Sequence, residues 1–141
     1  VNDSISTSIT RSVRIAIIGV DDAPVLVTSS RQPLPVTYAE QSSAVLVVVP
    51  GQVRVSDVDN MTLAACTVTV SPVPDGSSEQ LQYILPSGIT LANMVQNGTM
   101  SARYDFSASP MPQSASTFQQ LLSSLAFINT AVEPTPEPVR T

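Results

Sequence analysis

Short runs of β-branched and other apolar residues, each ended by proline, glycine, asparagine or aspartate, recur along the whole chain of 141 residues. The clearest run alternates strictly, and its apolar face consists of Met100, Ala102, Tyr104, Phe106 and Ala108. Strict alternation is typical of a strand with one buried face. Further strands are expected at 11–20, 25–28, 36–40, 44–49, 53–55, 64–70, 80–85 and 89–95, with a hairpin turn at Asn97-Gly98. The sequence therefore predicts an all-β domain.

Two segments depart from simple alternation. Residues 44–49 are apolar on both faces, which predicts a strand that is covered on both sides. A later segment instead has apolar side chains at helical spacing: Phe118, Leu121, Leu122 and Leu125. We expect a helix of about three turns here, capped by Ser116 or Thr117 and lying over one open end of the β structure.

Lysine and histidine are both absent, so arginine supplies all six positive charges. Without them the chain has no Ser-His-Asp triad, histidine-bound zinc, Schiff base or Walker lysine. A net charge of −5 gives no electrostatic attraction for nucleic acid or anionic membranes. The longest apolar run, residues 44–49, is too short to cross a bilayer. We therefore expect no enzymatic activity, no nucleic-acid partner and no direct membrane insertion.

Three asparagines lie in N-x-[ST] acceptor triplets for N-glycosylation: Asn2, Asn60 and Asn97. A chain rich in serine and threonine also forms such triplets by chance. The one cysteine, Cys66, lies on the apolar face of the predicted strand 64–70, so we expect a small buried hydrophobe rather than a reactive thiol. The triplets favour an extracellular or cell-surface location.

Several short motifs together resemble the cadherin-like, immunoglobulin-like repeats that occur in tandem in very large surface proteins. They are Asp21-Asp22-Ala23-Pro24 after the predicted strand 11–20, Val36-Thr37-Tyr38-Ala39-Glu40, Val48-Val49-Pro50-Gly51, Val55-Ser56-Asp57-Val58-Asp59, and Phe118-Gln119-Gln120-Leu121-Leu122. The resemblance implies an all-β, immunoglobulin/cadherin-like antiparallel sandwich with one short helix. The composition of the chain, with no lysine and much proline and threonine, would also suit the shaft of an extracellular filament, such as the axial protein of an algal flagellar hair (mastigoneme).

The resemblance also implies a division of the chain. Residues 1–20 correspond to the last strand or strands of a preceding repeat, 21–24 to an acidic linker, and 25–141 to a repeat without its final strands. A β-sandwich that lacks strands exposes unpaired backbone groups and an uncovered core face. Either neighbouring repeats supply the missing strands, or the strand 11–20 of one copy adds to the next copy. Both alternatives predict head-to-tail association with neighbouring copies or repeats, and head-to-tail contacts that do not close form filaments.

Five of the eleven acidic residues lie in the cadherin-like motifs: Asp21, Asp22, Glu40, Asp57 and Asp59. Calcium takes about six to eight oxygen ligands, and carboxylates gathered at a domain junction would provide several of them. The resemblance thus makes these residues candidates for calcium. The linker lacks the asparagines of the full cadherin signature, so the alternative is that these side chains bond the backbone of their own turns.

These observations favour a non-catalytic structural repeat that acts as a spacer, an adhesive unit or a filament-building unit. The alternative from another class is a ligand- or carbohydrate-binding β-sandwich. Such a module would need an exposed aromatic cluster or a concave polar pocket, and the chain has only three tyrosines and three phenylalanines.

Overall fold

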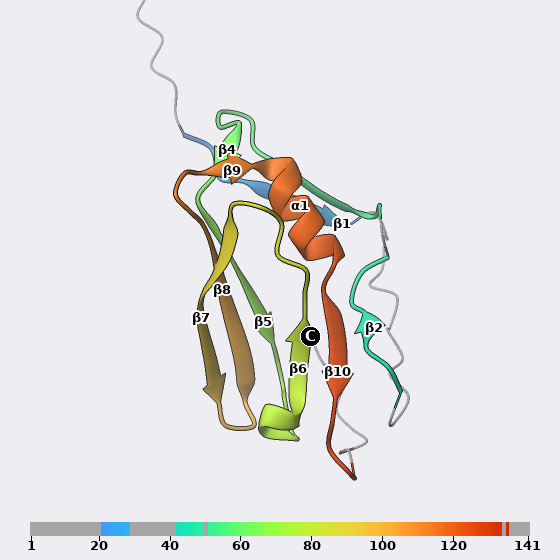
Figure 1. Cartoon of the computed structure of the whole chain (residues 1–141). Coiled ribbons are helices and arrows are strands. Elements are labelled where there is room, and N and C mark those ends of the chain that lie inside the picture. Colours follow the sequence, from blue (N-terminus) through green and yellow to red (C-terminus); the bar gives the residue numbers. More distant parts are fainter. Residues whose placement is uncertain (1–20, 29–41, 50, 134, 136–141) are drawn as a thin grey trace, which may run out of the picture.

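The computed structural model describes residues 21–28, 42–49, 51–133 and 135 of the chain. These residues form ten short strands, one α-helix and one turn of 3-10 helix (Figure 1). The strands are grouped in four small antiparallel sheets. The structure is therefore mostly β with one short helix, which confirms the prediction at this level. The predicted strands 11–20 and 36–40 lie outside the described residues.

The largest sheet has the order β5-β8-β7 and is built around a hairpin. Its strands are β5 (Ala65–Val70), β7 (Ile89–Asn97) and β8 (Ser101–Ala108). Gly98 adopts a φ of +55°, in the left-handed region that a glycine enters without a steric penalty. The backbone N–H of Met100 donates to the carbonyl of Asn97 at 3.0 Å. The predicted Asn97-Gly98 hairpin is confirmed.

The second three-stranded sheet has the order β2-β10-β6. Its strands are β2 (Val45–Leu46), β6 (Glu79–Gln82) and β10 (Ala126–Asn129). The 3-10 turn η1 (Gly76–Ser78) leads directly into β6. Two further pairs complete the structure: β1 (Val25–Thr28) with β3 (Val53–Ser56), and β4 (Thr62–Leu63) with β9 (Gln113–Ser114).

The prediction that residues 44–49 form a strand covered on both sides was wrong. Only Val45 and Leu46 are in a strand, and they pair on one side with β10. Three side chains of the run remain substantially exposed: Leu46, Val47 and Val49. Among the described strands β2 lies at the edge of its sheet, so it has one strand partner instead of the two of a central strand.

The helix α1 (Ala115–Ser123) lies at one end of the two larger sheets (Figure 1). The predicted cap at Ser116 or Thr117 was wrong, since Ser114 caps the helix and its hydroxyl accepts a hydrogen bond from the N–H of Thr117 at 3.3 Å. Ser114 ends β9 with extended backbone, the conformation that a capping residue needs. The apolar spacing was correct, because Phe118 and Leu121 are buried and Leu125 is buried just beyond the helix.

One core joins the helix to both larger sheets. Its buried members are Val73, Leu81, Ile89, Ala102, Tyr104, Phe106, Phe118, Leu121 and Leu125. Alternation along β8 buries Ala102, Tyr104 and Phe106 while Arg103 faces outward, as the sequence predicted. None of the helices in the part of the chain described here has the length and apolar character needed to cross a lipid bilayer.

Candidate functional site

Residues 21–22, which the sequence analysis assigns to an acidic linker, lie against the loop after β3. The carboxylate Oδ1 of Asp21 accepts a hydrogen bond from the Asn60 side-chain amide at 2.7 Å. The backbone N–H of Asp22 donates to Asp59 Oδ2 at 2.7 Å. We call the residues 21–22 and 57–60 the linker–loop site. Four of the five calcium candidates are therefore brought together here, and Glu40 lies outside the described residues.

The carboxylates of the linker–loop site act as acceptors within the loop itself. Asp57 Oδ1 accepts hydrogen bonds from the backbone N–H groups of Asp59 at 3.0 Å and Asn60 at 2.8 Å. An aspartate that bonds the backbone two and three residues ahead is typical of a turn. This geometry favours the turn interpretation over calcium for Asp57.

Within the described residues, no group of three or more acidic or cysteine side chains has the arrangement needed to hold a metal ion. The linker–loop site as described supplies carboxylates that already bond protein N–H groups, and this donor set falls short of calcium's demand for about six to eight oxygens. The fit to calcium is thus incomplete in this part of the chain. Because the prediction also included Glu40, calcium binding stays a prediction.

The two described glycosylation triplets differ in whether the asparagine side chain makes a hydrogen bond to another part of the chain. Asn97 is exposed at the turn between β7 and β8. Asn60 is also exposed, but its side-chain nitrogen, the atom that a glycan would modify, donates to Asp21. A glycan at Asn60 would replace one of the two hydrogens on this nitrogen and would therefore lie next to Asp21 in the linker–loop site. Asn2 lies outside the described residues.

A polar cluster that no sequence motif marked lies at the opposite end of the molecule from the helix (Figure 1). Glu79 is 1% exposed and Asn129 is 5% exposed. The Asn129 amide donates to Asp75 Oδ2 at 2.6 Å and to Glu79 Oε1 at 3.4 Å. The N–H of Thr135 also donates to Asp75, at 3.0 Å. The cluster ties the chain after β10 to the turn before β6, and no local motif could reveal contacts between residues fifty or more positions apart.

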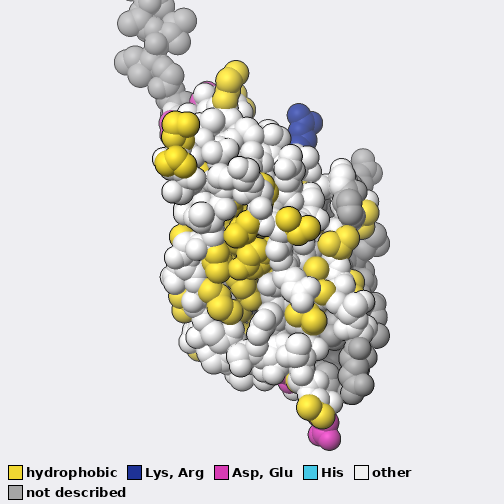
Figure 2. All heavy atoms as spheres, viewed as in Figure 1, with side chains coloured by type: hydrophobic (Ala, Val, Ile, Leu, Met, Phe, Trp, Pro, Cys, Tyr) yellow, Lys and Arg dark blue, Asp and Glu magenta, His cyan; other side chains and the backbone are white. Residues whose placement is uncertain are grey.

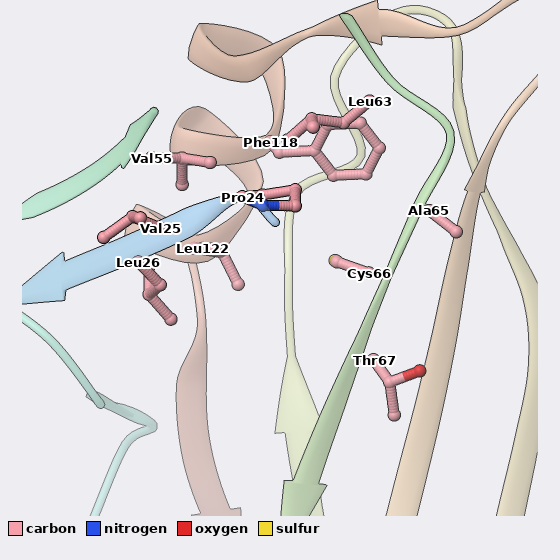
Figure 3. Close-up of a pocket in the computed structure, with 10 residues that line it drawn as sticks. All are labelled: Pro24, Val25, Leu26, Val55, Leu63, Ala65, Cys66, Thr67, Phe118 and Leu122. Carbon is pink, nitrogen blue, oxygen red and sulfur yellow. The ribbon is translucent and has the colours of Figure 1, made fainter. Parts of the chain in front are cut away.

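A small apolar pocket opens between β1 and β5 (Figure 3). Its volume is about 150 Å³. It is lined by Pro24, Val25, Leu26, Val55, Leu63, Ala65, Cys66, Thr67, Phe118 and Leu122. The lining contains no charged side chain, and its single hydroxyl belongs to Thr67. The pocket has the chemistry of a site for an aliphatic side chain rather than for a charged or sugar ligand.

Cys66 lies on the inward face of β5 and borders this pocket. It is half-buried and packs against the core. Burial raises the pKa of its thiol to about 11, so the thiol stays protonated at neutral pH and is a poor nucleophile. This supports the expectation of an apolar packing role, although the residue is not fully buried.

The strand β1 exposes apolar side chains on both of its faces. Val25, Leu26 and Val27 are consecutive, and their exposed fractions are 49%, 59% and 47%. Figure 2 shows that apolar side chains also group near the middle of one face of the molecule, where few charged side chains are in view. Three adjacent exposed aliphatic residues on a strand are unusual for a surface that meets only water.

The chain was also compared with known proteins. No protein-family model, no curated protein sequence and no solved structure matches it.

Proposed function

We propose that this chain is a non-catalytic structural module, a cadherin-like, immunoglobulin-like repeat of a large extracellular or cell-surface protein. In this proposal its mostly β structure belongs to a sandwich that neighbouring copies or repeats complete, and the module serves as a spacer or filament-building unit. Calcium at the linker and glycans at the asparagine triplets are further parts of the same proposal.

The observation that carries the proposal is the exposed apolar strand β1 next to an open strand edge. Residues Val25–Val27 are about half exposed, and in the described residues β1 pairs only with β3. Burial of apolar area contributes roughly 25 cal/mol per Å², so a partner that covers these side chains would be favoured. The linker–loop site at the start of β1 fits a junction between repeats.

The carbohydrate-binding alternative finds less support. Tyr104, Phe106 and Phe118 are buried in the core, while Tyr83 and Phe127 pack against it. No exposed aromatic side chain is thus available for stacking on a sugar within the described residues.

Sedimentation velocity over a wide range of protein concentration tests the proposal, with negative-stain electron microscopy of the same samples. We expect the sedimentation coefficient to rise with concentration and linear particles to appear at the highest concentrations. A single monomer boundary throughout, with no linear particles, would contradict the proposal.

A further inference from the structure

The pocket between β1 and β5 is bounded by the edges of two strands. Consecutive residues of a strand point to opposite faces, yet Ala65, Cys66 and Thr67 all line the pocket, and so do Pro24, Val25 and Leu26. Residues from both faces can meet one pocket only if the pocket lies beside the strand. Figure 3 shows β1 on one side and β5 on the other, with Phe118 and Leu122 of α1 between them.

The edge of β5 that borders the pocket has no strand partner among the described residues. β5 is the terminal strand in the order β5-β8-β7, and its register is given only with β8. A free edge next to an apolar pocket is the arrangement that binds an added strand, because main-chain hydrogen bonds hold the strand and the pocket takes alternate side chains. A pocket of about 150 Å³ has room for a small hydrocarbon group.

The chain carries a segment with the matching pattern. In residues 11–20 the apolar residues Val13, Ile15 and Ile17 alternate with Arg14 and Ala16. This pattern predicts a strand that presents one aliphatic face. The ten residues 11–20 span roughly 33 Å when extended, at about 3.3 Å per residue, and this length is available to contact a second molecule.

Charge favours the same segment. The described residues contain eight carboxylate side chains and two arginines, and one of these, Arg103, is paired with Asp105. The segment 11–20 instead carries Arg11 and Arg14 and no acidic residue. Opposite net charges of this kind speed association and orient the encounter.

Local geometry favours binding of the segment 11–20 to a second copy over binding to its own molecule. The N–H of Asp22 and the carboxylate of Asp21 are bonded to the loop at 59–60. To enter its own pocket, the segment would have to reverse immediately before these residues. The sequence there, Ile18-Gly19-Val20, has no Asn-Gly, Asp-Gly or Gly-Gly pair for a type I′ turn, so a two-residue reversal would have to be a type II′ turn with Gly19 at its first central position.

We propose that residues 11–20 of a second copy of this chain add as a strand to the free edge of β5, with one side chain of their aliphatic face, such as Ile15, seated in the pocket between β1 and β5. The inference rests on the proposed function, because it names the surface and the segment through which copies associate.

Disulfide trapping with the full chain tests the contact, since Cys66 is the only cysteine and borders the pocket. The natural chain is mixed with a tagged chain that carries Ile15→Cys in a Cys66→Ala background, under mild oxidation at alkaline pH. In this mixture a disulfide between position 15 and position 66 can form only between two molecules. We expect a reducible heterodimer whose linked peptides are identified by mass spectrometry.

Two matched variants control for random collision and for loss of folding. Ser77→Cys in the Cys66→Ala background places a thiol on the exposed turn η1, and we expect only background cross-linking from it. Leu26→Arg puts a charge on the exposed wall of the pocket and should lower the heterodimer yield roughly tenfold. Met94→Arg, at a similarly exposed apolar position on β7, should leave the yield unchanged.

The outcomes separate this inference from the proposed function. If sedimentation shows association but the Ile15→Cys chain cross-links no better than the Ser77→Cys control, the inferred strand addition at β5 is wrong and the proposed function stands. If a chain with Ile15→Cys and the natural Cys66 forms only an intrachain disulfide, the segment returns to its own molecule and the inference is overturned. If the chain stays monomeric throughout, the proposed function itself fails.

Discussion

The hydroxyl oxygen of Tyr104 accepts a hydrogen bond from the backbone N–H of Leu81 at 3.0 Å inside the core. Tyr104 belongs to β8 and Leu81 to β6, so this bond links the two three-stranded sheets. β6 is the terminal strand of its sheet among the described strands. The Tyr104 hydroxyl therefore accepts a hydrogen bond from a backbone N–H that has no described partner strand on that side. The bond therefore fixes how the two sheets face each other.

Replacing Tyr104 with phenylalanine should destabilise the fold by about 1–3 kcal/mol, because the buried N–H of Leu81 loses its acceptor. Urea unfolding measured by circular dichroism gives the free energy. Tyr83→Phe is the matched control, since the Tyr83 ring makes edge contacts with Tyr104 and Phe106 but its hydroxyl has no hydrogen bond among the described residues. Equal losses in both variants would show that the bond to Leu81 does not hold the sheets.

The alternation of apolar and polar residues was enough to predict strands and their buried faces where one face of the sheet packs against the core. The residues of β8 and the inward positions Cys66, Val68 and Val70 of β5 are examples. It failed for residues 44–49, because hydrophobicity alone does not tell a central strand from an edge strand. Which strands pair is decided by contacts distant in sequence, so the division into four small sheets could not be predicted.

The residues of the linker–loop site occur in short motifs, because Asp57 bonds the backbone of its own loop and residues 21–22 directly precede β1. The cluster of Asp75, Glu79 and Asn129 was missed for the opposite reason. A single acidic residue near a turn looks like a surface residue in the sequence. Only the return of the chain through β10 buries it.

Gly88 has a backbone conformation that residues with a side chain rarely adopt. Its φ is +81°, and an added Cβ would lie 2.6 Å from Nε2 and 2.7 Å from Cδ of Gln113, at the flexible end of that side chain. Gly88→Ala should therefore cost roughly 1–2 kcal/mol of left-handed backbone strain, together with the smaller cost of moving the Gln113 amide away from its contact with Met111. Gly51→Ala is the control, because Gly51 has a φ of +83° and open space around it. Thermal melting of both variants compares them, and a smaller loss at Gly88 than at Gly51 would contradict the contact with Gln113.

Asp105 should make the fold sensitive to acid. Hydrogen bonds from Arg103, at 2.8 Å to each carboxylate oxygen, and from Thr67 hold its pKa below the ordinary value. A pKa lower in the folded state than in the unfolded state adds stability above the unfolded pKa, and that stability is lost as pH falls through the folded pKa. The natural chain should thus exceed Asp105→Asn in stability at pH 7.

The advantage of Asp105 over its asparagine variant should shrink as pH falls below about 4, the usual range for an aspartate. Urea midpoints at a series of pH values check this, and Arg103→Gln should remove most of the pH dependence. Since the pair is on the surface, with 56% of the Arg103 side chain exposed, added salt should weaken the effect. A stability difference that is constant with pH would contradict the assignment.

The helix cap gives a further test of local structure. Ser114→Ala removes the acceptor for the N–H of Thr117 and should destabilise the fold by about 0.5–2 kcal/mol. Ser116→Ala is the control, because among the described residues the exposed Ser116 hydroxyl bonds only the Ser114 hydroxyl, at 2.8 Å, and caps no backbone group. Urea unfolding of the two variants should rank them in this order, and the reverse order would restore Ser116 as the cap.

Asp57 distinguishes a turn from a calcium site, because the two roles need different chemistry. As a turn residue it needs only an acceptor oxygen for the N–H groups of Asp59 and Asn60, which asparagine also provides. Asp57→Ala should therefore lower stability by about 1 kcal/mol, and Asp57→Asn should stay close to the natural chain. Under the turn interpretation, millimolar calcium leaves the melting temperatures of all three chains unchanged. Calcium that raises the melting temperature of the natural chain but not of Asp57→Asn would instead show that the charge of Asp57 binds the ion, since a ligand that binds only the folded state stabilises it.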